Sequence, residues 1–207
     1  MKYINIENAL IKPKPIFSSK DIEMAGFKVF PYQLSKWVKD GHLKRLIGGL
    51  FLFNRAEVNK EFIANHLRQP SYISLEYALY YYNLTVDIPF HVTSVTSKGT
   101  KKINIENNTF FYQHLKSSVF TGFVAINEKE KIGKMFYIAT PEKAFVDLFY
   151  LNPNKLQSEA DFKEARFHEN EIKKNLNWKD IFCLSDLYNN KRLKKRLSDF
   201  KDYLAIY

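Results

Sequence analysis

Between residues 30 and 53 a short helical pattern runs directly into two apolar segments that are separated by a pair of glycines. Pro31 suits the first turn of a helix, where a missing N–H costs no hydrogen bond, and Gly41 suits the position just beyond the last turn. The apolar residues between them repeat at the spacing of one buried helix face, and they are Leu34, Trp37 and Val38. Gly48 and Gly49 fit the two-residue turn of a β-hairpin. The stretch therefore predicts a helix followed at once by a tight hairpin.

The face of this predicted helix opposite its apolar stripe carries hydrogen-bonding and cationic side chains: Tyr32, Gln33, Ser35, Lys36 and Lys39. Lys44 and Arg45 follow on the first strand of the hairpin. Side chains of these types contact base edges and phosphates in protein–DNA complexes. The arrangement predicts the recognition helix and wing of a winged helix-turn-helix, with these residues as candidates for DNA binding. An ordinary surface helix and hairpin is the alternative interpretation, because lysine-bearing faces are common on proteins.

The preceding residues supply the order of elements that a winged helix-turn-helix requires. Residues 3–11 predict a first helix that ends before two prolines. Ser18 stands three residues before Asp21, which is the start signal of a second short helix. Ser18 and Ser19, at the start of that helix, are further candidates for DNA binding. We therefore predict a DNA-binding domain over residues 1–56, and the polar residues 54–57, where it ends, are a candidate linker.

The positive charge of the chain is concentrated in the same region. The whole chain has a formal net charge of +10. Residues 1–60 hold 11 Lys and Arg against 5 Asp and Glu, which gives +6, whereas the remaining residues give +4. This distribution favours a polyanionic partner such as double-stranded DNA.

Cysteine content and hydropathy predict the cellular compartment. Cys183 is the only cysteine, which excludes an internal disulfide and a cysteine metal cluster. With no signal-peptide pattern and no apolar run near the roughly 18 residues of a membrane span, we expect a cytoplasmic protein with no membrane partner. The apolar neighbours of Cys183 predict a buried thiol.

Residues 57–207 predict a larger domain with a small antiparallel or mixed sheet flanked by helices. Four β-branched or aromatic segments predict its strands, at residues 91–96, 109–113, 123–126 and 135–139. Thr140 and Pro141 then open a helix whose apolar face would cover the sheet. From about residue 158 the pattern predicts helices only, so the fold class of the whole chain is α+β.

Two segments in this domain, PSYISLEYAL and ATPEKAFVDL, favour a scaffold role. Ser74 can act as the N-cap of a helix that runs into three consecutive tyrosines at residues 80–82. These tyrosines favour packing in the core or at a domain interface over base stacking, since successive helical residues point in different directions. In the second segment Thr140 caps the helix, which is a scaffold role. The alternative interpretation is that Glu142 or Lys143 also contacts a partner.

The sequence offers no convergent set of catalytic or metal-ligating residues. Its five histidines are never spaced as paired ligands, and no phosphate-binding loop or nucleophile-elbow pattern occurs. Glu171 and Lys173 match a fragment of metal-dependent nuclease sites, but the fragment is common and lies in a helical stretch. We therefore expect no catalytic residue, no metal and no cofactor.

The final predicted helix carries a basic face opposite its apolar stripe. The stripe is Leu193, Leu197, Phe200 and Leu204, and the basic residues are Lys191, Arg192, Lys194, Lys195 and Arg196. A solvated face is the default interpretation of such a run, and a partner-binding surface is the alternative.

Several segments together resemble the AbiEi-type antitoxins of type IV toxin–antitoxin (abortive infection) systems, which are also described as predicted transcriptional regulators of viral defence. The matching segments are VKDGHLKRLIGGLFLF, PSYISLEYAL, HVTSVTSKGT, FYQHLKSSVFTGF and IATPEKAFVDLFYL, in the family's order up to Leu151. The resemblance implies a winged helix that binds inverted repeats upstream of its own operon and represses it, and a larger domain that neutralises a nucleotidyltransferase-like toxin. It maps the DNA-reading segment onto residues 32–39 and the wing onto residues 44–51. Gly48 stands where the family often has a basic residue, which weakens the implied wing contacts or shifts them to Lys44 and Arg45.

Two other hypotheses remain compatible with the sequence. One keeps the winged helix and makes the second domain a ligand-sensing or dimerising module of an ordinary transcription factor. The other makes the second domain a nuclease.

Overall fold

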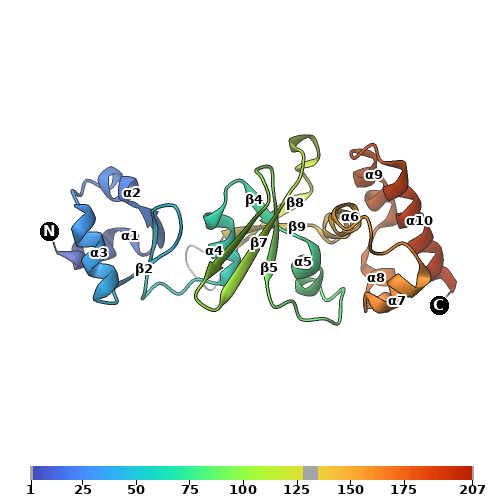
Figure 1. Ribbon diagram of the computed structural model, residues 1–207, viewed down its shortest axis with the longest axis horizontal. Coiled ribbons are helices and arrows are strands. Elements are labelled where there is room, and N and C mark those ends of the chain that lie inside the picture. Colours follow the sequence, from blue (N-terminus) through green and yellow to red (C-terminus); the bar gives the residue numbers. More distant parts are fainter. Residues whose placement is uncertain (1, 128–134, 207) are drawn as a thin grey trace. The chain divides into compact units, whose positions relative to one another are not determined.

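The computed structural model describes residues 2–127 and 135–206 of the chain (Figure 1). Its contacts divide the chain into two compact units. Unit 1 comprises Met1–Gln69 and Ile126–Phe136, and unit 2 comprises Pro70–Ala125 and Tyr137–Tyr207. The boundary at residue 56, drawn from sequence for a DNA-binding domain, stays a prediction.

Unit 1 begins with short helices and strands. In chain order they are α1 (Tyr3–Leu10), β1 (Ile16–Ser18), α2 (Ser19–Met24), α3 (Pro31–Lys39), β2 (Leu43–Arg45), β3 (Leu50–Phe53) and α4 (Lys60–Leu67). The three strands form an antiparallel sheet in the order β1-β3-β2. The sequence pattern did not predict β1, because three residues are too few to show a strand period and β1 is defined only by its pairing with β3.

The predicted helix and hairpin between residues 30 and 53 are confirmed. Helix α3 begins at Pro31, and its apolar side contributes Leu34 and Trp37 to the buried core. Gly48 and Gly49 have φ angles of 60° and 77°. Positive φ at both central residues is what a two-residue hairpin turn of this type requires. The Leu50 N–H closes this turn by donating to the Ile47 carbonyl at 3.1 Å.

A single apolar cluster joins the first three helices to the hairpin. Its buried members are Ile6, Leu10, Phe17, Ile22, Leu34, Trp37, Leu43, Phe51 and Phe53. Phe17 from β1 and Phe53 from β3 lie with ring centroids 4.4 Å apart. Burial of these side chains fixes α3 and the hairpin against each other, and the polar side of α3 is left exposed.

Unit 2 contains most of a six-stranded sheet and the C-terminal helices. The remaining strands are β4 (Ser71–Ile73), β5 (Val92–Thr96), β6 (Lys101–Ile105), β7 (Asn108–His114), β8 (Phe123–Asn127) and β9 (Met135–Ala139). The remaining helices are α5 (Leu75–Tyr81), the 3₁₀ turn η1 (Ser117–Val119), α6 (Pro141–Leu151), α7 (Glu159–Glu164), α8 (Glu169–Asn175), α9 (Trp178–Asp186) and α10 (Lys191–Ile206). The four strands predicted from sequence are all present, and β4 and β6 were missed.

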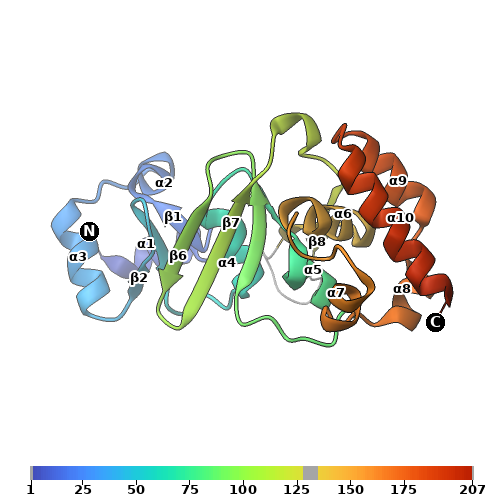
Figure 2. The same ribbon diagram turned by 45° about the vertical axis from the view of Figure 1, so that its right-hand side comes forward.

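The larger sheet is mixed, with the strand order β6-β7-β5-β4-β9-β8. Strand β4 pairs antiparallel with β5 and parallel with β9, and β5 pairs parallel with β7. Helices α5 and α6 pack together beside the sheet, and α9 and α10 pack on α6 (Figures 1 and 2). The mixed α+β fold class is therefore confirmed.

Capping residues mark the helix starts of unit 2 as the sequence predicted. The Lys143 N–H donates to Thr140 Oγ1 at 3.2 Å at the start of α6. Ser158 and Asp161 form a reciprocal capping box at the start of α7. The Asn177 side chain accepts from the Lys179 N–H at the start of α9.

Ser74 lies at the N-cap position of α5, but its predicted capping hydrogen bond is wrong. Its side chain accepts no hydrogen bond from the first turn. Its hydroxyl donates instead to Asp147 Oδ2 at 2.9 Å. The helix starts with Leu75 in the left-handed region, at a φ of 61°.

The prediction that the tyrosines at 80–82 pack in the core holds only in part. Tyr80 and Tyr81 are each 41% exposed. Tyr82 is half-buried and donates its hydroxyl to the Ala139 carbonyl at 3.0 Å. The difference arises because α5 buries one side only, so that consecutive residues cannot all face the core.

The expected burial of Cys183 is also wrong, because this thiol is exposed. Helix α9 buries Ile181 and Ser185, one turn apart. Cys183 lies midway between them in sequence and thus on the opposite side of the helix.

None of the helices in the described residues has both the length and the apolar character needed to cross a membrane.

Candidate functional site

Helix α3 presents the polar face that the sequence predicted. Tyr32 is 68% exposed. Ser35, Lys36 and Lys39 are exposed on the same helix. Gln33 differs from them, because it is half-buried and its Oε1 accepts from the Phe30 N–H at 3.0 Å. The side-chain amide oxygen of Gln33 therefore caps the start of its own helix.

The structure brings this face into contact with the first strand of the hairpin. Arg45 Nη2 donates to Ser35 Oγ at 3.3 Å. The Arg45 guanidinium also lies 5.5 Å from the centre of the Phe51 ring. These contacts hold a cation of β2 beside the exposed side of α3. Lys44, the neighbouring candidate, is half-buried.

Ser18 and Ser19 lie at the start of α2 and have different environments. Ser18 donates its hydroxyl to Asp21 Oδ2 at 2.8 Å, and Asp21 also forms an ion pair with Lys14. Burial raises the pKa of Asp21, but the hydrogen bonds from Lys14 and Ser18 outweigh it and hold this pKa below its ordinary value. Ser18 is therefore committed to the helix cap, whereas Ser19 is exposed.

Four of the five basic residues predicted to form one face of α10 are exposed. Lys191, Arg192, Lys194 and Lys195 are exposed. Lys194 forms an ion pair with Asp186, and Arg192 Nη2 donates to Gln157 Oε1 at 3.3 Å.

Placing Arg196 on this exposed face was wrong. Its residue exposure is only 5%. Its guanidinium donates to four backbone carbonyls around the end of α6, those of Phe149 (2.7 Å), Asn152 (3.0 Å), Lys155 (2.6 Å) and Leu156 (3.1 Å). Arg196 lies three residues after Leu193 and four before Phe200, so the helical period places it on the apolar stripe of α10. The four carbonyls supply the hydrogen-bond acceptors that a buried guanidinium needs.

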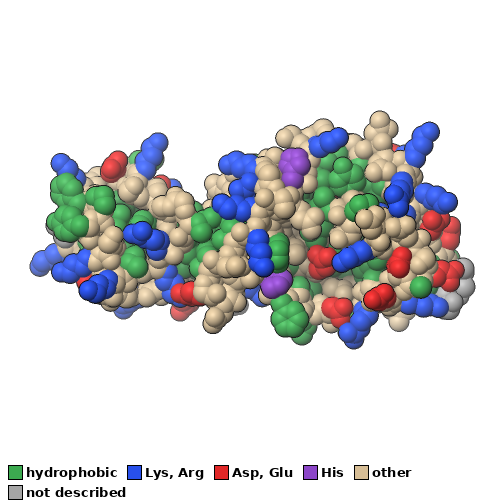
Figure 3. Space-filling view, in the orientation of Figure 1, with side chains coloured by type: hydrophobic (Ala, Val, Ile, Leu, Met, Phe, Trp, Pro, Cys, Tyr) green, Lys and Arg blue, Asp and Glu red, His purple; other side chains and the backbone are tan. Residues whose placement is uncertain are grey.

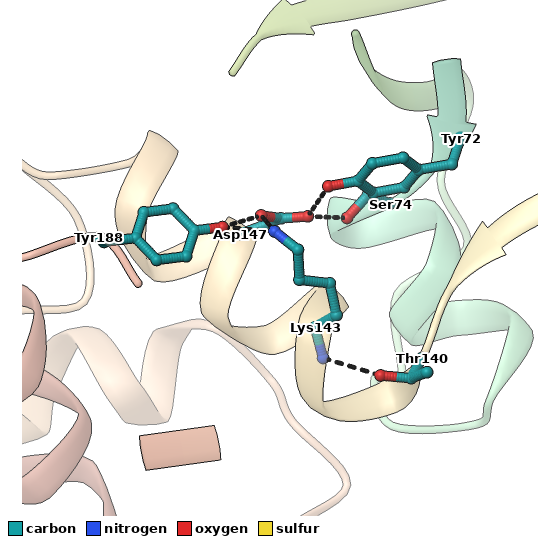
Figure 4. Close-up of polar contacts among 6 residues, drawn as sticks. All are labelled: Tyr72, Ser74, Thr140, Lys143, Asp147 and Tyr188. Carbon is teal, nitrogen blue, oxygen red and sulfur yellow. Dashed lines mark hydrogen bonds and ion pairs between the residues drawn. The ribbon is translucent and has the colours of Figure 1, made fainter. Parts of the chain in front are cut away.

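A second set of polar side chains lies wholly inside unit 2 (Figure 4). Lys143 and Asp147 are one turn apart on α6, and both side chains have 0% exposure. Their Nζ and Oδ1 atoms lie 2.5 Å apart. The possible partner contact by Lys143 is therefore excluded, because its side chain does not reach the surface.

The Asp147 carboxylate accepts hydrogen bonds on both oxygens. Tyr188 donates to Oδ1 at 2.5 Å, Tyr72 donates to Oδ2 at 3.0 Å, and Ser74 donates to Oδ2 at 2.9 Å. Lys143 Nζ also donates to the Tyr188 hydroxyl. Four donors thus compensate the buried carboxylate, which is the condition under which a charge is tolerated in a protein core.

Burial dominates the protonation equilibria of this cluster. It lowers the pKa of Lys143, and the charge of Asp147 only partly offsets the effect. It raises the pKa of Tyr72 and of Tyr188, and the Asp147 charge adds to both shifts. The two tyrosines therefore stay protonated as donors.

The cluster ties together three parts of unit 2 that lie far apart in the sequence. Tyr72 comes from β4, Ser74 from the start of α5, Lys143 and Asp147 from α6, and Tyr188 from the turn after α9 (Figure 4). Gly122 contributes by its lack of a side chain, because a Cβ there would lie 3.0 Å from Lys143 Cγ. We assign the cluster a structural role, since its charged groups are satisfied by one another. The sequence signal for it was the pair of charges spaced i, i+4 inside the apolar run of α6.

Within residues 2–127 and 135–206, no group of three or more His, Cys, Asp or Glu is placed to hold a metal ion. Glu171 and Lys173 lie on helix α8 and not on a strand.

No protein-family model matches the chain, and no curated protein matches it in sequence.

Proposed function

We propose that the chain is a DNA-binding antitoxin that represses its own operon and neutralises a nucleotidyltransferase-like toxin. In this proposal α2, α3 and the β2–β3 hairpin act as a winged helix-turn-helix, and the later part of the chain acts on the toxin. The proposal rests on the residues of unit 1 and on the resemblance to AbiEi-type antitoxins.

The observation that carries the DNA-binding half is the contact between α3 and the hairpin. Arg45 is held beside Ser35, so that the cations of β2 and those of α3 can face one ligand together. Lys36 and Lys39 lie on the exposed side of α3, and unit 1 holds the excess of positive charge. A polyanion with a regular spacing of phosphates, such as duplex DNA, fits this arrangement.

The salt dependence of DNA binding tests this half. The probe is the duplex immediately upstream of the chain's own coding sequence, titrated with the full-length protein at several salt concentrations. Replacing Lys36, Lys44 and Arg45 together by glutamine should reduce the log–log salt slope by about 0.9 for each phosphate that is no longer neutralised, hence by about 2.7 if all three side chains bind phosphate. The control replaces Lys191, Arg192 and Lys195 of α10 in the same way and should leave the salt slope unchanged. An unchanged slope in the first variant would remove these residues from the interface.

Growth after expression of the neighbouring gene tests the antitoxin half. We expect growth arrest by the neighbour alone and rescue by the full-length chain. The DNA-binding variant should rescue equally well, because neutralisation is assigned to other residues. A neighbour that causes no arrest, or an arrest that the chain does not relieve, would contradict the antitoxin proposal.

One observation favours a second candidate, a transcription factor whose second unit senses a ligand. Unit 2 contains a cavity of about 600 Å³, which lies in the range typical of small-molecule sites. A small molecule that changes the DNA affinity of the chain, with no toxin encoded nearby, would support this candidate.

A further inference from the structure

The cavity of unit 2 lies between α5, the connection from α5 to β5, the end of α6 and α7. Its lining is predominantly apolar, with Leu79, Leu148 and Leu156 among the side chains that form it. In Figure 3 acidic side chains and exposed hydrophobic side chains lie next to each other over the region of α7 and the α5–β5 connection. A pocket that is apolar in its depth and charged at its mouth is suited to an amphipathic ligand.

Two aromatic side chains line the cavity, one at the surface and one that reaches the core. Phe90 lines the cavity and is 96% exposed. Ile88 and Val86, which lie on the same connection but outside the lining, are 70% and 44% exposed. Phe167 also lines the cavity and packs against Phe145 in the core, with ring centroids 5.5 Å apart. Exposed apolar side chains gathered at one cavity mark a binding surface more often than scattered ones do.

The wall formed by the α5–β5 connection is fixed in position by backbone hydrogen bonds. The Val86 N–H donates to the Arg166 carbonyl at 3.0 Å, and the His168 N–H donates to the Leu84 carbonyl at 3.0 Å. Thr85 and Phe167 form an isolated antiparallel bridge between the same two segments. The cavity is therefore formed before any ligand arrives, which lowers the entropic cost of binding.

The charges around the cavity select the sign of the ligand. Four carboxylates line it, those of Glu76, Asp87, Asp161 and Glu164, whereas Lys155 is the one cationic residue among its lining residues and His91 is formally neutral. The cavity lining is therefore negatively charged, although the chain as a whole has a net charge of +10.

Two of these carboxylates already have partners. Asp87 forms an ion pair with Arg166 at 2.8 Å. Asp161 accepts from the N–H groups of Gln157 (2.7 Å) and Ser158 (3.0 Å). The side chains of Glu76 and Glu164 make no hydrogen bond or ion pair to any other described residue. They are the groups available to a cation.

We infer that this cavity binds a small organic cation, an amine or guanidine with an apolar body. The ammonium or guanidinium group would pair with Glu76 and Glu164, and the apolar body would contact Phe90, Phe167 and the leucines of the lining. Phe90 adds the attraction of an aromatic face for a cation. Anions of the same size are repelled by the carboxylates.

Isothermal titration of the full-length protein tests the inference with two probes of nearly the same size and opposite charge, tryptamine and indole-3-acetate. We expect tryptamine to bind at least about tenfold more tightly, because the two carboxylates attract one probe and repel the other. Tighter or equal binding of indole-3-acetate would overturn the inference, and so would the absence of binding heat with tryptamine at two well-separated temperatures.

Matched variants locate the site. Replacing Glu76 and Glu164 together by glutamine should weaken tryptamine binding about tenfold and bring the two probes close in affinity. The control replaces Asp199 and Asp202, two exposed carboxylates of α10, by asparagine and should leave both affinities unchanged.

Phe90→Ser tests the apolar contact at a residue too exposed to support the fold. It should weaken the binding of both probes and preserve the preference for the cation. An unchanged affinity in the Glu76 and Glu164 variant would also overturn the inference. Because no DNA or toxin is present, these outcomes are independent of the proposed antitoxin function.

Discussion

The substitution Lys143→Met would break the buried ion pair of α6 while nearly preserving side-chain volume. Both partners have 0% side-chain exposure, so the carboxylate of Asp147 would remain in the core without a counter-charge. Removing one partner of a buried pair typically costs about 3–5 kcal/mol. Asp147 keeps the hydroxyl donors of Tyr72, Ser74 and Tyr188, so we expect a loss near the lower limit, about 3 kcal/mol.

Urea denaturation of the full chain measures this loss if the signal comes from unit 2 alone. The chain has two tryptophans, Trp37 in unit 1 and Trp178 in unit 2. In a Trp37→Phe background the fluorescence reports on Trp178, whose ring lies 6.4 Å from that of Phe145 on α6. A loss of about 3 kcal/mol should also lower the melting temperature by about 6–12 °C for a chain of this size.

A matched lysine provides the control. Lys194 pairs with Asp186 on the surface, where the two side chains are 48% and 57% exposed. Lys194→Met should therefore cost no more than about 1 kcal/mol. If Lys143→Met costs no more than Lys194→Met, then water reaches the pair and our account of the cluster is refuted.

Three further outcomes follow from the structure. Arg196→Met should destabilise unit 2 by about 3 kcal/mol or more, because four carbonyls lose a charged donor, whereas Arg192→Met on the same helix should change the urea midpoint little. Gly49→Ala should cost unit 1 about 1–2 kcal/mol in a Trp37 fluorescence titration, since φ at this turn is 77°. Burial lowers the pKa of His66 below its ordinary 6.5, so its contribution to stability is present above pH 6.5 and is lost as the pH falls through the lowered pKa. The urea midpoint of unit 1 should thus fall between pH 7.5 and pH 5.5, and His66→Gln should make that fall smaller.

Local signals in the sequence predicted most helices and the hairpin because the groups that decide them are neighbours. The capping boxes at Ser18 and Ser158 each use a side chain and an N–H three residues apart. The turn at Gly48 and Gly49 depends on the backbone freedom of those two residues. Such features form wherever the same few residues occur, provided that the adjoining segments find a core.

The short strands could not be predicted in the same way. Strand β4 is three residues long and exists through its pairing with β5 and β9. The polar sequence of β6, with Lys101, Lys102 and Asn104, resembles a loop, and only its pairing with β7 makes it a strand. Pairing partners of this kind are set by the topology of the sheet and not by local propensity.

The candidate sites divide along the same line. The polar face of α3 follows from helical periodicity alone, so that Tyr32, Ser35, Lys36 and Lys39 could be selected from sequence. The sequence by itself also determined the caps, the glycine turn and the concentration of positive charge in the first 60 residues. Tertiary structure alone decided that Ser74 donates to Asp147, 73 residues away, and that Arg196 donates to four carbonyls 40 or more residues away. It likewise assembled the cavity from segments that lie far apart in the chain. Burial and pairing over such separations depend on which elements pack together, and that choice is made by the whole core.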